Sequence, residues 1–255
     1  MPAEQNISYY RCQAGKFEPV SGGIITESPV SLHVNGNLWL TFMCTPIEIE
    51  ALAVGFLFTE GVLESRNELQ DVSVHHKGHM VEVWLTKEVS KPKNWRFTSG
   101  CAGGAVSGDK TIQKVPLVEG RLTADQVLQI SSTLLAHQGV YKRVGGVHTS
   151  ALFDGSNLLF VAEDIGRHNT MDKLAGRIFL DQIDAENKII ATSGRISSEM
   201  LQKAASMGVG VVISRTSPTS LSIQLAEEYQ ITLVGYARSK NFNVYAHRMQ
   251  IANGS

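Results

Sequence analysis

The clearest hydrophobic pattern lies in the second half of the chain, where short apolar runs alternate with segments of helical period. Apolar strand-like segments at 147–154 and 157–164 flank Asp154-Gly155, a dipeptide typical of hairpin turns. Further strands are expected at 188–193, 209–214, 231–237 and 241–247, and helices at about 170–180, 196–208 and 217–229. Strands that alternate with helices predict a layered sheet covered by helices.

The first half contains two further hairpin patterns. Apolar alternation over 28–43 is interrupted by Asn35-Gly36-Asn37, and a second hairpin is expected over 71–86 around Lys77-Gly78. His75, His76 and His79 lie in the second one. Metal ligation by these histidines is the alternative to a solvated hairpin tip, and the tip is favoured because no cysteine or acid has ligand spacing nearby.

Two capping-box patterns predict helix starts. In the first, Thr45 caps, Pro46 takes the first helical position and Glu48 completes the box, with the helix ending near Gly61. In the second, residues 123–126 form the box and the helix runs to about residue 137.

Composition narrows the class of protein. The chain has 255 residues, 43% apolar and 18% charged, with a net charge of -1, as in ordinary soluble globular proteins. This balance offers no support for nucleic-acid or membrane binding, and no apolar run is long enough to span a bilayer. The first residues lack the apolar core of a secretion signal, so a cytoplasmic location is expected.

The three cysteines, Cys12, Cys44 and Cys101, form no C-x-x-C, which argues against a disulfide framework and a cysteine-rich zinc site. Cys101 lies in a segment from Ser90 to Lys110 that is rich in Gly, Ser and Lys and has no apolar period. We expect this segment to be mobile without a partner. A thiol on such a basic, Gly-rich segment is the candidate nucleophile, whereas Cys44 follows an apolar strand and is expected to be buried.

Polar residues follow three successive predicted strands of the second half. Ligands in open α/β sheets bind beyond the carboxyl ends of strands, where helix N-termini and arginines favour phosphates. The candidate binding residues there are Ser193, Arg195, Ser214, Arg215, Tyr236, Ala237, Arg238, Ser239, Lys240 and Asn241. We expect Arg195, Arg215 and Arg238 to converge on one pocket. The alternative is surface arginines that only cap loops.

A polar turn at 164–169 adds further candidates, Arg167, His168 and Asn169, with His148 in the preceding strand. The pattern favours ligand contact for His168 and leaves His148 open between a ligand contact and a core histidine. Asp164 has three interpretations: it orients Arg167, accepts a hydrogen bond from a base or ribose, or is a helix N-terminal acid.

Several of these segments together resemble one known family. GGVHTSALFD, EDIGRHNTMDKLAG, TSGRISSEM, ISRTSPTSLSIQLAEE and LVGYARSKNFNVYAH are similar to successive signatures of the FdhD family, the formate dehydrogenase accessory sulfurtransferases. TPIEIEALAVGFLFTEG resembles the family's N-terminal helix, and the match runs from about Ser28 onward.

The resemblance implies an α/β, cytidine-deaminase-like layered α/β/α fold with a smaller N-terminal region of β-hairpins and a helix. It implies that sulfur passes as a persulfide on Cys101 from a cysteine desulfurase to the molybdenum or tungsten cofactor of formate dehydrogenase. The cofactor would be bound as its bis(guanine dinucleotide) form, with no metal site of the protein's own, and the family implies a homodimer. We expect an N-terminal α+β region at 1–122 that includes Cys101, and a C-terminal cofactor-binding domain at 123–255.

One departure from the family pattern affects the mechanism. The family's C-G-x-C-G reads here Cys101-Ala102-Gly103-Gly104-Ala105, so Gly104 replaces the second cysteine. A persulfide needs one sulfur nucleophile, so transfer stays possible, but a two-cysteine relay does not. The rival interpretation is a non-catalytic chaperone of the molybdenum cofactor. A zinc deaminase is disfavoured, because His148 is followed by Thr149-Ser150 and C-x-x-C is absent.

Overall fold

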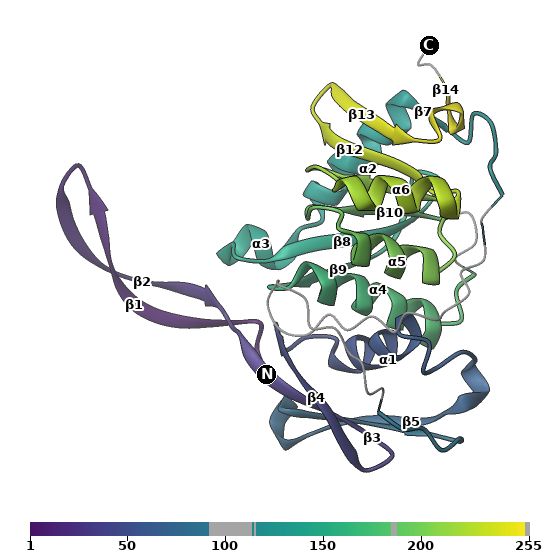
Figure 1. The fold of residues 1–255 in the computed structure, drawn as a ribbon. Coiled ribbons are helices and arrows are strands. Elements are labelled where there is room, and N and C mark those ends of the chain that lie inside the picture. The colour runs from purple at the N-terminus through teal and green to yellow at the C-terminus, as the bar shows by residue number, and fades with distance from the viewer. Residues whose placement is uncertain (92–113, 115, 185–187, 253–255) are drawn as a thin grey trace.

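The computed structural model describes residues 1–91, 114, 116–184 and 188–252. Cys101 and nearly all of the segment expected to be mobile lie outside the described residues. Figure 1 shows a main body, a smaller sheet below it, and a long hairpin that projects away from both.

The main sheet, as far as the structure describes it, has six strands in the order β13-β12-β11-β10-β8-β9. Strands β10, β11 and β12 are parallel, β8 pairs antiparallel with both β9 and β10, and β13 pairs antiparallel with β12. Their bounds are β8 His148–Asp154, β9 Asn157–Asp164, β10 Ile189–Thr192, β11 Val211–Ser214, β12 Thr232–Arg238 and β13 Asn241–Ala246. Every strand predicted in the second half of the chain is therefore confirmed.

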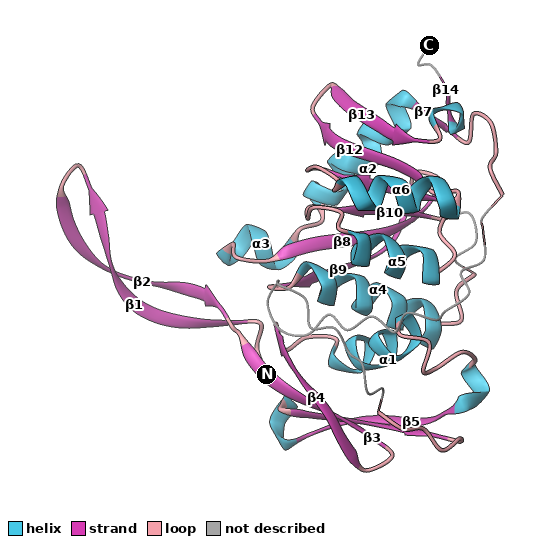
Figure 2. Ribbon diagram, in the orientation of Figure 1, coloured by secondary structure: helices cyan, strands magenta, loops and turns pink. Residues whose placement is uncertain are grey.

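Helices cover both faces of this sheet (Figure 2). On one face α4 (Arg167–Leu180), α5 (Ser198–Ser206) and α6 (Ser220–Tyr229) pack on apolar side chains such as Leu152 and Val212. On the other, α2 (Ala124–Ala136) packs on alternate residues of the same strands. Because neighbouring residues of a strand point to opposite faces, apolar strands need helices on both sides. The predicted α/β/α layering is confirmed.

A smaller sheet of order β4-β3-β6-β5 forms the N-terminal unit together with α1 (Ile49–Thr59). Its strands are β3 Ser28–Val34, β4 Asn37–Cys44, β5 Leu69–His75 and β6 Met80–Leu85, so both predicted hairpins are present. Asn35 and Gly36 have φ of 48° and 77°, the left-handed values that a tight hairpin turn requires. Residues of α1 and the inner sheet face form a separate buried core.

The remaining elements are short or peripheral. They are β1 Glu4–Gln13, β2 Lys16–Ile25, β7 Leu122–Thr123, β14 Ile251–Ala252, α3 Gly139–Val144, and the 3-10 turns η1 Arg66–Glu68, η2 His76–Gly78 and η3 Arg248–Gln250. The β1–β2 hairpin and α3 were not predicted from the sequence. Every residue of β1 after Glu4 is exposed, and Tyr10 and Phe17 are more than 70% exposed, so the hairpin lacks the buried alternation that identifies a strand.

The prediction of a capping box at Thr45–Glu48 is wrong. Helix α1 begins at Ile49, and its N-cap Glu48 has a left-handed φ of 51° with no side-chain cap. The Thr45 hydroxyl instead accepts a hydrogen bond from the Ile165 N–H, 3.2 Å away, so a tertiary contact takes the group that would have capped the helix. The box at Thr123 and Gln126 is confirmed.

Three other helix starts differ from expectation. Helix α4 begins at Arg167 rather than Thr170, so the polar turn forms its first residues. Helix α5 begins at Ser198, with Ser197 as its cap. Helix α6 begins at Ser220 and is capped by Thr219, because Pro218 forms a strand-like bridge with Ile196.

Helices α1 and α4 touch through their backbones, which joins the N-terminal unit to the main body. A Cβ placed on Gly55 would overlap the carbonyl oxygen of Asp172, and one on Gly176 would overlap that of Ala51. Neither obstacle is a side chain that could turn aside.

Gly55→Ala is therefore expected to lower the free energy of unfolding by about 1–3 kcal/mol through overpacking, as measured by urea denaturation. Gly139→Ala is the matched control, because its added Cβ would meet neighbours no closer than 3.4 Å. Equal stability of the two variants would contradict the backbone contact.

Candidate functional site

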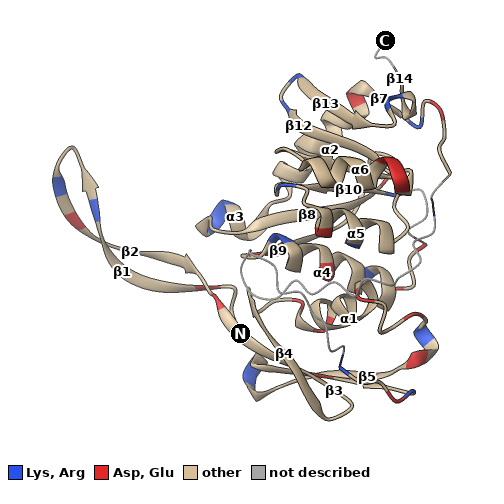
Figure 3. Cartoon of the chain, viewed as in Figure 1, with Lys and Arg blue, Asp and Glu red and all other residues tan. Residues whose placement is uncertain are grey.

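The carboxyl ends of β10, β11 and β12 lie at one edge of the main sheet. Thr192 at the end of β10 pairs with Ser214 of β11 and with Ser150 of β8, so His148, two residues earlier in β8, begins at the same edge. Figure 3 shows basic positions spaced along this edge, from the start of α4 to the turn between β12 and β13. We call this the strand-end edge. The candidate binding residues follow its strands or lie at the start of α4.

A first group on this edge consists of His148, Arg167 and Arg195. A Cβ on Gly194 would lie 3.1 Å from Cβ of Arg167 and 3.6 Å from Nδ1 of His148, so the backbone after β10 lies directly against both side chains. Burial, and then the charges of Arg167 and Arg195, lower the pKa of His148. His148 is thus a partly exposed imidazole whose charged form is disfavoured by burial and by the charges of Arg167 and Arg195.

A second group consists of Arg215, Tyr236 and Arg238. Arg238 Nε donates to the carbonyl of Arg215 at 2.6 Å, and Arg215 Nη1 donates to Ser131 Oγ at 3.0 Å. Burial and the neighbouring Arg238 lower the pKa of Arg215. The Arg238 guanidinium thus lies on the Arg215 backbone, and the two positive charges at this end of the edge favour an anion nearby.

Tyr236 has a left-handed φ of 54°, and its ring lies 6.0 Å from the Arg238 guanidinium carbon. Such a backbone conformation is strained for an aromatic residue and is typical of functional sites. The following turn, Ser239, Lys240 and Asn241, is exposed, and Ser239 also has a positive φ.

The three arginines therefore occupy one edge in two groups. Arg215 and Arg238 are in contact, while Arg195 lies with His148 and Arg167. The groups are linked through the backbone, because Ser214 Oγ donates to the Gly194 carbonyl at 2.7 Å.

Other candidate residues use their polar atoms inside the protein. Asn169 donates to Asp164 and to the Met43 carbonyl, and Ser193 Oγ accepts from the Thr149 N–H. Ser214 and Ala237 are fully buried. Asn169, Ser214 and Ala237 therefore shape the edge from inside, while Ser193 is partly exposed.

His168, the second residue of α4, is only 6% exposed. Its Nε2 lies 3.1 Å from Glu199 Oε2 and 3.4 Å from Ser197 Oγ, both at the start of α5. Burial, and next the charges of Lys203, Arg167 and His148, lower the pKa of His168 to about 3. Glu199 was missed in the sequence, where it is an ordinary first-turn acid; only the packing of α5 on α4 brings it to His168.

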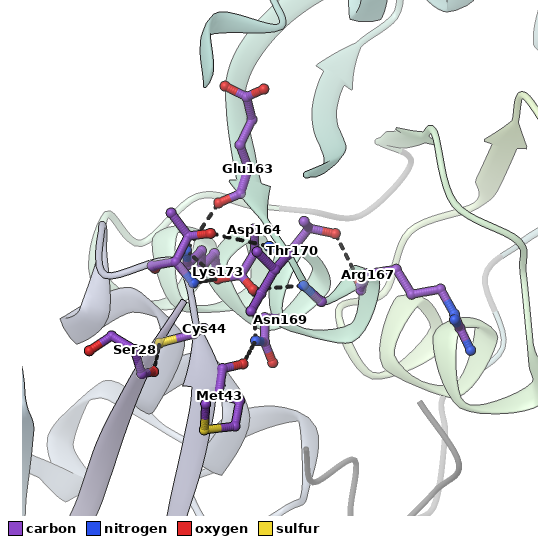
Figure 4. A network of polar contacts seen from close by, with 12 residues as sticks. Ser28, Met43, Cys44, Glu163, Asp164, Arg167, Asn169, Thr170 and Lys173 are labelled. Carbon is purple, nitrogen blue, oxygen red and sulfur yellow. Dashed lines mark hydrogen bonds and ion pairs between the residues drawn. The ribbon is translucent and has the colours of Figure 1, made fainter. Parts of the chain in front are cut away.

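Asp164 is the hub of a buried polar network (Figure 4). One carboxylate oxygen, Oδ1, accepts from Gly166 N and Asn169 Nδ2, each at 2.8 Å, and so holds the turn that begins α4. The other, Oδ2, accepts from the Thr45 N–H at 3.1 Å and from Lys173 Nζ at 2.7 Å. Asp164 is fully buried, so it connects the N-terminal unit to the site turn instead of accepting from a base or ribose.

The adjacent residue, Glu163, points to the opposite side of β9, as alternation along a strand requires. Its carboxylate accepts from the N–H groups of Gly139, Val140 and Tyr141 at the start of α3. Helix α3 in turn holds the base of the projecting hairpin through the Arg143–Glu4 ion pair at 3.1 Å.

The hairpin histidines do not gather into a metal site. Among the described residues, no three His, Cys, Asp or Glu side chains are placed to hold a metal ion. His75 instead lies 2.9 Å from Ser73 Oγ. In the described part of the chain, no helix has the length and apolarity needed to cross a membrane.

Comparison with known proteins finds relatives that match nearly the whole chain. The model of the FdhD/NarQ family matches residues 25–252. A "Sulfur carrier protein FdhD" of Staphylococcus haemolyticus is 35% identical over 254 residues, covering 97% of this chain and 96% of the relative. The protein of the same name in Bacillus subtilis is 36% identical over 249 residues, with 95% of each chain covered.

A solved structure is also similar. A crystal structure described as a formate dehydrogenase accessory protein from Desulfotalea psychrophila matches with a TM-score of 0.83 and 26% identity. The match covers 98% of this chain and 100% of the other.

Proposed function

The chain belongs to the FdhD/NarQ family, and on that premise we propose that it is a sulfur carrier that serves the maturation of formate dehydrogenase. The observation that carries the proposal is the close similarity to proteins named sulfur carriers along 95% or more of the chain. The cationic strand-end edge supports a phosphorylated cargo.

Cys101 is the proposed sulfur carrier, although it lies outside the described residues. Its thiolate attacks the terminal sulfur of a donor persulfide, forms a new S–S bond, and releases the donor thiolate, so the step is redox-neutral. Cys44 is unsuited to this role, since burial, and next the charge of Asp164, raise the pKa of its thiol to about 12. A sulfurtransferase activity would follow from Cys101 alone.

The proposed cargo is the molybdenum or tungsten bis(pterin guanine dinucleotide) cofactor, bound as substrate. Arg167 begins α4, and Arg195, Arg215 and Arg238 follow or end strands at the strand-end edge, so their guanidinium groups suit its phosphates. The strained Tyr236 offers an aromatic face beside them. The residues present thus fit the ligand in charge and in donor type.

We further propose a cysteine desulfurase as sulfur donor, formate dehydrogenase as client, and a homodimer as the working form. In this scheme residues 1–122 carry the sulfur and residues 123–255 bind the cofactor. The Asp164 network is the contact through which the N-terminal unit meets the site turn.

The test is the intact mass of the full chain after incubation with a cysteine desulfurase and cysteine. A gain of about 32 Da, one sulfur atom, is expected. Absence of a gain together with guanine-nucleotide binding would replace the carrier with a non-catalytic chaperone of the cofactor, the alternative that Gly104 favours.

Arg238→Ala is expected to weaken binding of GDP, a probe for one guanine nucleotide of the cofactor, by roughly tenfold, because a charge-assisted hydrogen bond contributes about 1.5–3 kcal/mol. Isothermal titration calorimetry measures the effect. Arg177→Ala is the matched control, since Arg177 is in the last turn of α4 and is paired with Asp181. Equal loss in both variants would point to net charge and not to a site.

A further inference from the structure

Glu199 and His168 form a pair between the first turns of two helices that begin at the strand-end edge. Helix α5 is capped by Ser197, whose Oγ accepts from the Met200 N–H, and this cap places Glu199 over α4. The side chains of His168 and Glu199 are 7% and 19% exposed, so water does not compete freely for their 3.1 Å contact.

The chemistry of the two groups decides where the imidazole proton lies. The hydrogen bond of Nε2 is to Ser197 Oγ at 3.4 Å, and the Glu199 carboxylate lies beside it at 3.1 Å. Because an ionised carboxylate repels an imidazole lone pair, this close contact favours the tautomer in which Nε2 carries the hydrogen. In a neutral imidazole the other nitrogen, Nδ1, is then an acceptor. No hydrogen bond to Nδ1 of His168 is formed within the part of the chain that the structure describes.

We propose that Glu199 is a positioning residue that fixes His168 as the Nε2–H tautomer, so that Nδ1 is kept as an acceptor for an N–H or O–H donor of the ligand. Guanine and pterin rings both carry such N–H donors, whereas the neighbouring arginines can only donate. The arginines would then bind the phosphate oxygens of the ligand, and His168 would accept a hydrogen bond from its ring or sugar. The inference rests on the proposed cofactor site.

A second ion pair, one helical turn after His168 and Glu199, holds α4 and α5 in the alignment that brings these two residues together. Asp172 follows His168 by four residues on α4, and Lys203 follows Glu199 by four on α5, so the two pairs are stacked rungs between the helices. Lys203 Nζ lies 2.6 Å from Asp172 Oδ1 and 3.1 Å from Thr59 Oγ1 of α1.

The same rung keeps His168 neutral. Burial and the Lys203 charge are the two largest causes that lower the pKa of His168 to about 3, so the ring does not gain a second proton near neutral pH. A protonated ring would have no acceptor to offer.

A simpler interpretation makes the opposite prediction about binding. If Glu199 is only an acid near a cationic edge, its removal relieves repulsion and an anionic nucleotide binds more tightly. If Glu199 positions His168, loss of the acceptor oxygen weakens binding despite the favourable change in charge. Glu199→Gln and Glu199→Ala remove the same charge, but only the former keeps an oxygen acceptor.

The first experiment uses the full chain with ¹⁵N-labelled histidine and long-range ¹H–¹⁵N spectra between pH 6 and 8. His168 is expected as a single, neutral Nε2–H tautomer, and Glu199→Ala is expected to show averaged ¹⁵N shifts of two tautomers. A protonated ring or the Nδ1–H tautomer in the wild-type protein overturns the proposal. This result does not depend on any ligand.

The second experiment is titration with GDP. Glu199→Ala is expected to bind about tenfold more weakly, because the ligand donor loses the acceptor that the positioned ring offers, while Glu199→Gln binds at least as well as wild type. Glu228→Ala, an exposed acid of α6, controls for charge. Tighter binding by both Glu199 variants overturns the proposal. If wild type itself fails to bind GDP, the cofactor site fails and the tautomer spectra alone judge the role of Glu199.

Discussion

The Cys101→Ala variant is expected to gain no sulfur when it is incubated with a cysteine desulfurase and cysteine, whereas the wild-type chain gains about 32 Da. The physical reason is that persulfide formation needs a thiolate that can reach the donor sulfur. Intact-mass spectrometry under non-reducing conditions measures the adduct directly.

The other two cysteines supply matched controls. Cys44 is buried, and its thiol has a pKa of about 12, so Cys44→Ala should keep the adduct. Cys12 is exposed on β1, where it lies opposite Phe17, and Cys12→Ala should keep the adduct too. Loss of the adduct in Cys12→Ala, with retention in Cys101→Ala, would move the carrier to the projecting hairpin.

Gly104→Cys separates carrier from chaperone. If wild type accepts no sulfur and this variant does, the missing second cysteine explains the defect and the natural chain acts as a cofactor chaperone. If both accept one sulfur equally, a single cysteine is sufficient for the carrier step.

The Lys173→Met variant is expected to lose about 3–5 kcal/mol of unfolding free energy, because it leaves the Asp164 carboxylate charged and buried without its cation. Both side chains are fully buried, and their 2.7 Å ion pair is extended by bonds from Lys173 Nζ to the carbonyls of Thr45 and Glu163. Urea denaturation followed by circular dichroism measures the loss.

Lys188→Met is the surface counterpart of that change. Lys188 pairs with Asp154 at 3.3 Å, but the Asp154 side chain is 60% exposed, so the loss is expected to be at most about 1 kcal/mol. The double variant Asp164→Asn/Lys173→Met should be more stable than Lys173→Met alone, since no unpaired charge remains. If Lys173→Met is as mild as Lys188→Met, the buried pair does not hold the two units together.

The strands and the layering were predictable because they depend on local apolar periodicity. The central strands β10, β11 and β12 are short apolar runs bounded by turn residues, and apolar residues on both faces call for helices on both sides. The common edge for Arg195, Arg215 and Arg238 followed as well, since parallel strands end at the same side of a sheet. The division of these arginines into two groups did not follow, because it depends on side-chain packing.

Two capping patterns of the same type had different outcomes. Thr123 caps α2 as predicted, whereas Thr45 bonds to Asp164 and Ile165, which are 119 and 120 residues away along the chain. The local pattern is the same in both cases, and a distant partner decides which hydrogen bond forms. The same holds for Glu199, whose meeting with His168 requires two helices to pack.

The sequence by itself determined the α/β layers, the family and the common edge of Arg195, Arg215 and Arg238, because these rest on periodicity, on motifs and on strand direction. Only the tertiary structure decided that Asp164 is buried and links the N-terminal unit to the turn before α4. It also decided that Asn169 and Ser214 face inward, and that His168 is a neutral partner of Glu199. Burial and long-range pairing set those roles, and neither is encoded in the spacing of neighbouring residues.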